Sequence, residues 1–188
     1  MIKRPIHLSH DFLAEVLDGQ SVAVDATMGN GHDTLFLARL AKQVYAFDIQ
    51  EQALTKTRQR LKEAGLDNVR LILAGHEELS RYVPRFKAAI FNLGYLPSAD
   101  KSVITQPQTT LQALDQVCQG LEVGGRAAVM IYQGHAGGDR ERDAVLDFVR
   151  QLPQQAFTVM LYKTLNQINH PPFLVMIEKL KEEKDQNG

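Results

Sequence analysis

Short apolar runs alternate along the chain with segments in which apolar and polar residues recur at helical spacing. The runs are rich in β-branched and aromatic residues, and most are continuously apolar, which is typical of strands covered on both faces of a sheet. They are Ser21–Ala26, Val44–Asp48, Val69–Leu73, Ala88–Asn92, Ala127–Gln133, Phe157–Tyr162 and Phe173–Glu178. The pattern therefore predicts seven strands separated by helices.

Three amphipathic stripes predict the faces by which helices pack on the sheet. The stripes consist of Phe12, Leu13, Val16 and Leu17; of Leu111, Leu114, Val117, Cys118 and Leu121; and of Val145, Phe148, Val149 and Leu152. Thr105 and Gln108 have the spacing of a capping box with Pro107 in the first turn, which predicts that the second of these helices begins there. Further helices are expected over Asp33–Lys42 and Glu77–Tyr82.

Strands that alternate with helices predict a parallel sheet with right-handed crossovers and helices on both faces. The last connection, from Lys163 to Pro172, is too short for a crossover helix, so the final strand should enter antiparallel. We therefore expect an α/β fold that resembles the Rossmann-like class I methyltransferases, with a seven-stranded, mostly parallel sheet and an antiparallel last strand. A single domain is expected over residues 1–180, with a charged tail over residues 181–188.

Composition and charge restrict the possible partners. The 188 residues are 44% hydrophobic and 23% charged, which is ordinary for a globular protein. Lys and Arg total 21 against 22 Asp and Glu, so RNA could be held only by local clusters and not by a general basic field. The candidate clusters are Lys3 with Arg4, Lys101, Arg140 with Arg142, and Lys163.

Several kinds of site and location are not expected. The single cysteine, Cys118, excludes an intramolecular disulfide and a cysteine-built zinc site. The histidines at 7, 10 and 32 have no metal-ligand spacing, so no metal is expected. No apolar run reaches the ~18 residues of a membrane span, and no leader-like apolar segment follows Met1. We expect a cytoplasmic protein that makes no contact with a membrane.

A glycine-containing loop after the first strand, Asp25–Thr34, predicts a cofactor site. Gly29 and Gly31 allow the backbone to approach a ligand closely, and ligands of open parallel sheets bind at the carboxyl ends of the strands. Thr34 stands where a dinucleotide fingerprint requires a third glycine, and Asp33 would repel a pyrophosphate at the start of the helix. S-adenosylmethionine, which has no phosphate, suits such a loop better.

The cofactor is expected to contact several residues of this loop, namely Asp25, Thr27, Gly29, Asn30, Gly31, Asp33 and Thr34. Asp25 would hold the ammonium of the methionyl group, or else cap the turn. Asn30 and Asp33 are polar side chains suited to line the pocket, and N-capping of the following helix is their alternative role.

Two further strand ends supply candidate cofactor contacts. Asp48 ends the second strand, where a carboxylate can accept hydrogen bonds from both hydroxyls of a ribose. Gln50 would add a hydrogen bond to the ribose or adenine, or merely begin the next helix. Gly75 and His76 follow the third strand, and His76 is expected near the adenine amine. A surface histidine that caps the short helix is the alternative for His76.

The end of the fourth strand predicts where a methyl acceptor binds. Asn92-Leu93-Gly94-Tyr95 looks like a variant of the Asn/Asp-Pro-Pro-Tyr/Phe motif of amino-methylating enzymes of this fold, although its prolines are absent. The Asn92 side-chain oxygen and a following carbonyl would accept the two amine N–H bonds and leave the lone pair facing the methyl. Tyr95 would flank the base or the developing charge. A plain strand end followed by a turn is the alternative.

The long loop that follows this strand carries two more candidates. Asp100 would take the amine proton and Lys101 would touch a phosphate, although either could be a solvated loop charge. After the fifth strand, His135 lies in a second glycine-rich turn at the same sheet edge and is a further catalytic candidate.

Three other residues are expected to contact the substrate. Tyr132 ends the fifth strand, and Asn169 and Pro171 precede the last one, where they could rim the pocket.

Taken together, five phrases resemble one family of small bacterial rRNA methylases, now associated with wobble-uridine modification of tRNA. The phrases are Asp25–Thr34, Ala46–Gln50, Asn92–Lys101, Tyr132–Gly138 and Asn169–Phe173. The resemblance implies methyl transfer from S-adenosylmethionine to the 5-aminomethyl group of a wobble uridine, often 2-thiolated, in a tRNA anticodon stem-loop. It also implies a homodimer, and it leaves ribosomal RNA open as the substrate.

Other functions remain open on the residues alone. Methylation of carbon 5 of a pyrimidine normally needs a cysteine nucleophile, and Cys118 lies on an apolar stripe away from every loop named above. Methylation of a small-molecule or protein amine fits the near-neutral charge equally well. A catalytically silent RNA-binding scaffold has no need for both Asp48 and Asn92, and the missing third glycine disfavours an NAD-dependent dehydrogenase.

Overall fold

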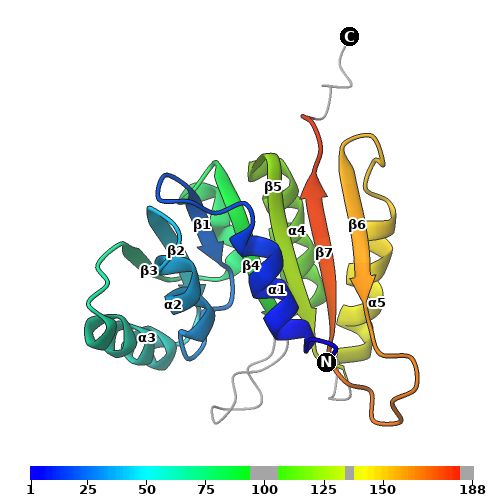
Figure 1. Ribbon diagram of the computed structural model, residues 1–188, viewed down its shortest axis with the longest axis horizontal. Helices are drawn as coiled ribbons and strands as arrows, with labels where there is room; N and C mark the ends of the chain where they lie inside the picture. Colours follow the sequence, from blue (N-terminus) through cyan, green and yellow to red (C-terminus); the bar gives the residue numbers. More distant parts are fainter. Residues whose placement is uncertain (94–105, 134–137, 183–188) are drawn as a thin grey trace.

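A seven-stranded sheet forms the centre of the computed structural model, which describes residues 1–93, 106–133 and 138–182 (Figure 1). The strand order is β3-β2-β1-β4-β5-β7-β6. The strands are β1 (Val22–Asp25), β2 (Gln43–Asp48), β3 (Val69–Leu73), β4 (Phe86–Leu93), β5 (Leu121–Ile131), β6 (Phe157–Tyr162) and β7 (Phe173–Lys179). Strand order reverses at β1, and ligands of open α/β sheets bind outside the carboxyl ends of the strands at such a point, here those of β1 and β4.

Strand direction agrees with the sequence prediction. The pairs β1–β2, β1–β4, β2–β3 and β4–β5 are parallel, whereas β7 pairs antiparallel with both β5 and β6. Because the chain between β6 and β7 holds no helix, β7 returns as a hairpin partner of β6 and inserts beside β5, with Phe173 opposite Ile131. The expected α/β architecture with an antiparallel last strand is confirmed.

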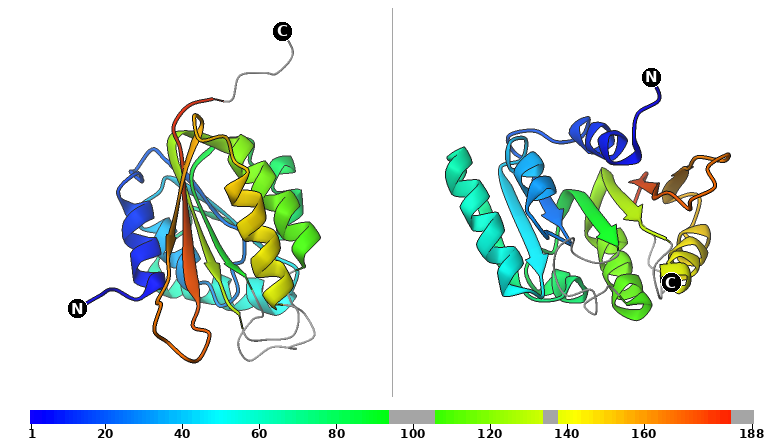
Figure 2. Two further views of the ribbon diagram at one scale, coloured as in Figure 1. Left: turned by 90° about the vertical axis from the view of Figure 1, so that its right-hand side faces the viewer. Right: turned by 90° about the horizontal axis from the view of Figure 1, so that it is seen from below.

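Helices cover both faces of the sheet (Figure 2). On one face lie α1 (Pro5–Ala14), α2 (His32–Ala38) and α3 (Glu51–Ala64). On the other lie the 3-10 helix η1 (His76–Arg81), α4 (Pro107–Gly120) and α5 (Gly138–Arg150). β4 is buried on both sides, with Ile90 in the core under α1 and α2 and Phe91 in the core under α4 and α5. Cys118 is buried in the second of these cores, as its apolar stripe predicts.

Element ends differ from the sequence prediction in several places. α4 begins at Pro107 as predicted, with Gln106 as its N-cap residue, and Thr105 of the predicted capping box lies outside the described residues. α2 ends at Ala38, short of the predicted Lys42, and α1 ends before the last two residues of its predicted stripe. β5 begins at Leu121, well before the predicted start, because pairing with β4 continues across an irregularity in register.

Candidate functional site

The loop after β1 lies across the carboxyl ends of two neighbouring strands. The Ala26 N–H donates to the Ile90 carbonyl of β4 at 2.9 Å, and the Met28 N–H donates to the Phe47 carbonyl of β2 at 2.9 Å. These bonds hold the loop at the point where strand order reverses, at the lower edge of the sheet in Figure 1. The predicted cofactor residues that follow β1, β2 and β3 are thereby brought to one edge.

Two glycines give this loop its shape. Gly29 and Gly31 have φ values of 51° and 77°, a region that side chains disfavour. A Cβ on Gly31 would lie 2.6 Å from the Thr57 hydroxyl oxygen of α3, so the loop can pack on α3 only with glycine there. Gly31 is also the N-cap residue of α2 and no side chain caps that helix, so the capping alternative for Asn30 and Asp33 is wrong.

Asp25 is fully buried beneath the loop and has two hydrogen-bond donors. Its Oδ1 accepts from the Thr27 N–H at 3.2 Å, and its Oδ2 accepts from the Thr34 hydroxyl at 2.6 Å. Burial, and next the nearby Asp33 carboxylate, raise the pKa of Asp25 to about 7. Asp25 therefore caps the turn, one of its two expected roles, and its contact with a methionyl ammonium stays a prediction.

Asp48 points back to the glycine loop from the end of β2. Its Oδ2 accepts from the Gly29 N–H at 3.0 Å, and its Oδ1 accepts from the N–H of Gln50 at 2.9 Å. Burial raises the pKa of this carboxyl, against the lowering effect of those N–H bonds. Each oxygen keeps a further lone pair, so the carboxylate is oriented and can still accept from a diol. Gln50 is the N-cap residue of α3, without a capping side-chain bond.

His76 is buried, with 7% of its surface exposed, so the surface-histidine alternative is wrong. Its ring lies 5.8 Å from that of Phe91, and its Nε2 has no hydrogen-bond partner among the described residues. Burial lowers the pKa of His76, which favours the neutral ring. Gly75, the buried N-cap residue of η1, precedes it. A buried polar atom without a partner costs about 1–3 kcal/mol, and a bound adenosine would satisfy it. The residues present therefore fit S-adenosylmethionine.

Asn92 ends β4 beside the glycine loop and is held at two points. Its backbone N–H donates to the Thr27 hydroxyl oxygen at 2.7 Å, and its side-chain Nδ2 donates to Asp33 Oδ2. The second oxygen of Asp33 bonds with Nε2 of His10, on α1, at 2.6 Å. Asn92, the residue expected to hold the methyl-accepting amine, is thus linked through Asp33 to His10. The sequence analysis names His10 only among the histidines that lack metal-ligand spacing. No local pattern could have found His10, because its partner lies on another helix.

Tyr132 lies just beyond β5, and its N–H donates to the Leu93 carbonyl at 3.3 Å. Burial, and next the Asp33 charge, raise the pKa of the Tyr132 hydroxyl. Gln133, which the sequence analysis did not single out, donates through Nε2 to the Pro171 carbonyl at 2.9 Å. That bond brings the predicted rim residue Pro171 to this edge, whereas Asn169 is exposed.

Four of the predicted site residues lie outside the described part of the chain. They are Tyr95, Asp100, Lys101 and His135. Their proposed roles stay predictions. Within the described ranges, no group of three or more His, Cys, Asp or Glu residues could hold a metal ion. No helix in the same ranges is both long and apolar enough to cross a bilayer.

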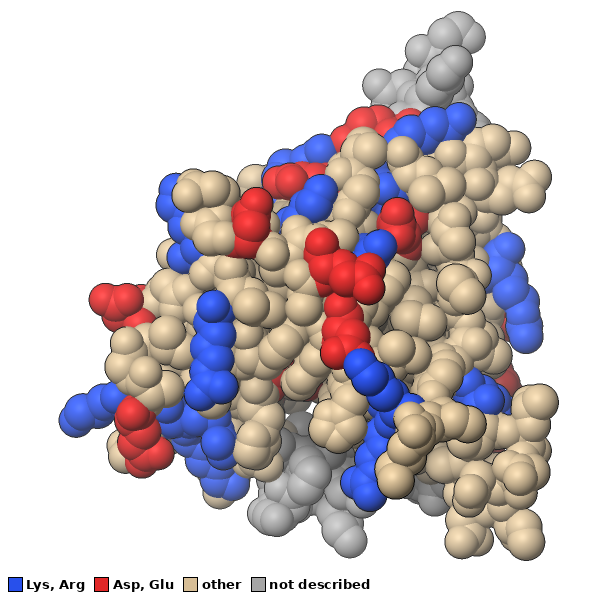
Figure 3. Space-filling model, in the orientation of Figure 1, with Lys and Arg blue, Asp and Glu red and all other residues tan. Residues whose placement is uncertain are grey.

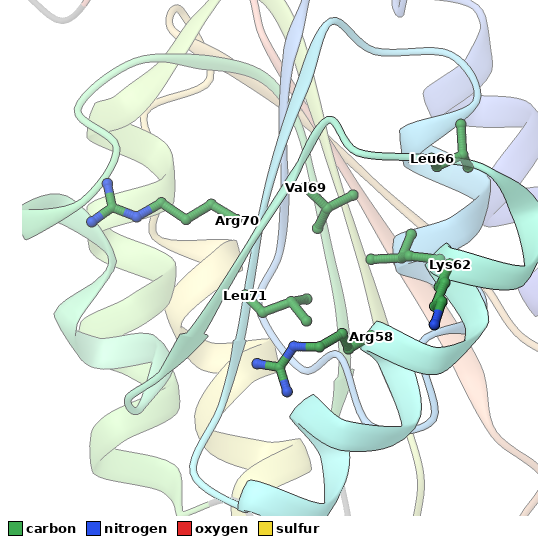
Figure 4. A pocket seen from close by; sticks show the side chains of 7 residues that line it. Arg58, Lys62, Leu66, Val69, Arg70 and Leu71 are labelled. Carbon is green, nitrogen blue, oxygen red and sulfur yellow. The ribbon is translucent and has the colours of Figure 1, made fainter.

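Basic side chains gather on the outside of α3, close to the glycine loop. Lys and Arg are prominent there in Figure 3, at the lower left, where Figure 1 shows α3. A hollow of about 550 Å³ lies between α3 and β3, where Arg58 and Lys62 flank the apolar side chains Val69 and Leu71 (Figure 4). Within residues 1–93, 106–133 and 138–182, neither of these two cations forms an ion pair.

The basic clusters expected from the sequence are partly neutralised. Lys3 pairs with Asp11, and Arg142 pairs with Asp139 and Asp143 at 2.7 and 2.8 Å. Lys163 lies over the ring of Phe173 at 5.3 Å. Arg58 and Lys62, which form no ion pair in the described ranges, are therefore a further candidate surface for an anionic partner.

The fold and the site at its switch point define a class I S-adenosylmethionine-dependent methyltransferase, and the dehydrogenase alternative is wrong. Residues 44–178 match the family described as "Putative rRNA methylase", and the chain belongs to that family. The family resemblance drawn from the sequence is thus confirmed.

Three relatives illustrate the match. A "putative methyltransferase" from Streptococcus mutans, solved in complex with SAH, is 65% identical, with 96% of this chain and all (100%) of that chain covered and a TM-score of 0.92. A "putative rRNA-methylase" structure from Clostridium thermocellum is 42% identical, with 95% and 99% covered and a TM-score of 0.92. The chloroplastic tRNA (mnm(5)s(2)U34)-methyltransferase of Arabidopsis thaliana is 32% identical over 192 residues, 94% of this chain and 70% of that protein.

Proposed function

We propose that this protein N-methylates the 5-aminomethyl group of a wobble (2-thio)uridine in tRNA, giving the methylaminomethyl form. The name of the Arabidopsis relative supports a tRNA wobble-uridine substrate. The observation that carries the amine chemistry is the anchored Asn92 carboxamide at the end of β4. With Nδ2 bonded to Asp33, the Asn92 Oδ1 faces away from that carboxylate and can accept an N–H from an incoming amine.

Each described residue of the site has a separate task in this reaction. Asp48 would accept the ribose hydroxyls, and His76 Nε2 would bond with the adenine, so that the cofactor is fixed against the glycine loop. S-adenosylmethionine supplies an electrophilic methyl group on sulfur. Asn92 would hold the neutral amine with its lone pair in line with that methyl, a positioning effect that converts binding into rate. The amine lone pair would form the new N–C bond, the sulfur would keep the electron pair of the broken S–C bond, and the ammonium so formed would release its proton to water.

RNA would be bound by phosphate contacts next to this edge. Arg58 and Lys62 on α3 are exposed and without ion pairs in the described ranges, and α3 packs on the glycine loop through Thr57. Phosphate contacts position an RNA, while an unpaired loop base can be presented to the site. An anticodon stem-loop has both features.

We also propose that the protein is a homodimer. β6 is the edge strand of the sheet, and large apolar side chains are exposed on it and on the chain that follows. Met160 is 60% exposed, Leu165 95% and Ile168 92%. Burying such side chains against a second copy would remove them from water. Sedimentation of the wild type and of a Leu165→Asp, Ile168→Asp variant tests this, and a monomeric wild type would overturn it.

Single-turnover methylation of synthetic anticodon stem-loops tests the reaction. A loop with 5-aminomethyl-2-thiouridine at the wobble position should be methylated, and a loop with unmodified uridine should not. Equal methylation of both loops would exclude amine chemistry. Mass spectrometry of tRNA and rRNA nucleosides from cells that lack the protein separates the two RNA classes, because only the true substrate loses its methylated nucleoside.

A further inference from the structure

A chain of side-chain contacts joins three elements behind the candidate acceptor site. The ring of His10 on α1 stacks on Phe36 of α2, with centroids 3.9 Å apart and planes 4° from parallel. His10 Nε2 bonds with Asp33 Oδ1 at 2.6 Å, and Asp33 Oδ2 accepts from Asn92 Nδ2 at the end of β4. Asp33 is 9% exposed and therefore largely shielded from water, whereas 26% of the His10 side chain is exposed.

We propose that His10 is a positioning residue that acts through Asp33 to fix the orientation of the Asn92 carboxamide during methyl transfer. This inference rests on the proposed function, because it assigns Asn92 the task of holding the acceptor amine.

The physical reason is the two-fold ambiguity of a carboxamide. If the Asn92 side chain turned over, its Oδ1 would face the Asp33 carboxylate, and two acceptors would oppose each other. Asp33 therefore selects the orientation in which Oδ1 points away from it, toward an acceptor amine. No described residue donates a hydrogen bond to that Oδ1.

Asp33 can select this orientation only while its own carboxylate is fixed. One oxygen faces Asn92, and the other is held by the N–H at His10 Nε2, which must carry a proton to donate to a carboxylate. Stacking on Phe36 in turn fixes the plane of the His10 ring. The charge of Asp33 also reaches the rest of the site, since it raises the pKa of Asp25 and of Tyr132. The same negative charge would favour the ammonium that methylation forms.

A matched pair of substitutions separates positioning from mere packing. In His10→Gln the side-chain amide N–H replaces the donor at Nε2. In His10→Asn the side chain carries the same carboxamide but is one methylene shorter, so it cannot reach Asp33. His7→Ala is the control, because His7 lies exposed on the same helix. We expect His10→Asn to lower the single-turnover rate about tenfold or more, the equivalent of one hydrogen bond. His10→Gln and His7→Ala should stay within about twofold of wild type, with S-adenosylmethionine affinity unchanged in all three.

A second measurement does not depend on activity. The second measurement is the NMR spectrum of isotope-labelled protein, in which the signals of the Asn92 side-chain NH2 group report its hydrogen bond to Asp33. These signals are identified by their loss in the spectrum of Asn92→Ala. They should move in His10→Asn and keep their positions in His10→Gln and His7→Ala. Equal rates for the two His10 variants, or Asn92 signals that do not respond to His10→Asn, would overturn the inference.

The two proposals fail in different ways. If wild-type protein leaves the aminomethyl loop unmethylated, the proposed function is wrong, and the amide signals still decide whether His10 orients Asn92. If the wild type methylates the loop and His10→Asn does so at the wild-type rate, the function stands and the role of His10 is wrong.

Discussion

Substitution of Asn92 by alanine tests the link between the geometry of this site and its chemistry. The change removes the carboxamide and the hydrogen bond from Nδ2 to Asp33, while the backbone bond to Thr27 remains. A hydrogen bond to a charged partner contributes about 1.5–3 kcal/mol, so the free energy of unfolding should fall by an amount that most domains tolerate. His10 still holds Asp33 in this variant, which limits the damage to the neighbouring side chains.

The effect on the reaction should be larger and more selective than the effect on stability. Loss of one preorganised donor or acceptor typically lowers a rate by about 10²–10³-fold, and we expect the lower end of that range for Asn92→Ala. S-adenosylmethionine affinity should stay near the wild-type value, because the cofactor contacts assigned here come from other strand ends. The residual rate should still rise with pH until the acceptor amine is mostly neutral, since the ammonium form has no lone pair.

The assay is single-turnover methylation of the 5-aminomethyl-2-thiouridine stem-loop, run beside calorimetry with S-adenosylmethionine. Gln154→Ala is a suitable control, because it removes an exposed carboxamide just before β6, far from the carboxyl ends of the parallel strands. An Asn92→Ala protein that methylates at the full rate would refute the assigned role. A variant that loses rate and cofactor affinity in equal measure would place Asn92 in the cofactor site instead.

Three other predictions concern the cofactor, pH and RNA. Asp48→Ala should weaken S-adenosylmethionine binding at least about tenfold by calorimetry, since it removes the carboxylate that we propose accepts the ribose hydroxyls; unchanged affinity in a folded variant would contradict the assignment. Burial lowers the pKa of His76 in the folded state, so protonation favours unfolding, and the free energy of unfolding should fall as pH drops below the ordinary value of 6.5. Urea titrations of wild type and His76→Gln should show a flatter pH dependence in the variant, and parallel curves would disprove this origin. The double variant Arg58→Glu, Lys62→Glu should bind the stem-loop more weakly and should reduce the slope of log affinity against log salt by about 2. The control Lys42→Glu, at the opposite end of the parallel strands, should change neither the affinity nor the slope.

Much of the fold follows from local pattern. The continuous apolar runs predict the strands, and β3 and β6 have the predicted bounds. The short link between Lys163 and Pro172 predicts an antiparallel β7, because no crossover helix fits there. The position of the glycine loop and of Asp48 after successive strands predicts that they meet at one edge, since parallel strands end together. Each of these inferences depends only on spacing within one or two neighbouring elements.

The orientation of the site residues, in contrast, is decided by contacts between distant segments. His76 is buried because β4 brings Phe91 beside it, and its local sequence is equally compatible with a surface helix cap. Asp33 has the spacing of a capping residue, yet its carboxylate bonds with His10 and Asn92. His10 joins the site only because α1 packs on β5 and β7 next to α2. Hydrophobic periodicity determines which face of a helix is buried, but packing and the pairing of buried polar groups decide which side chain each residue meets.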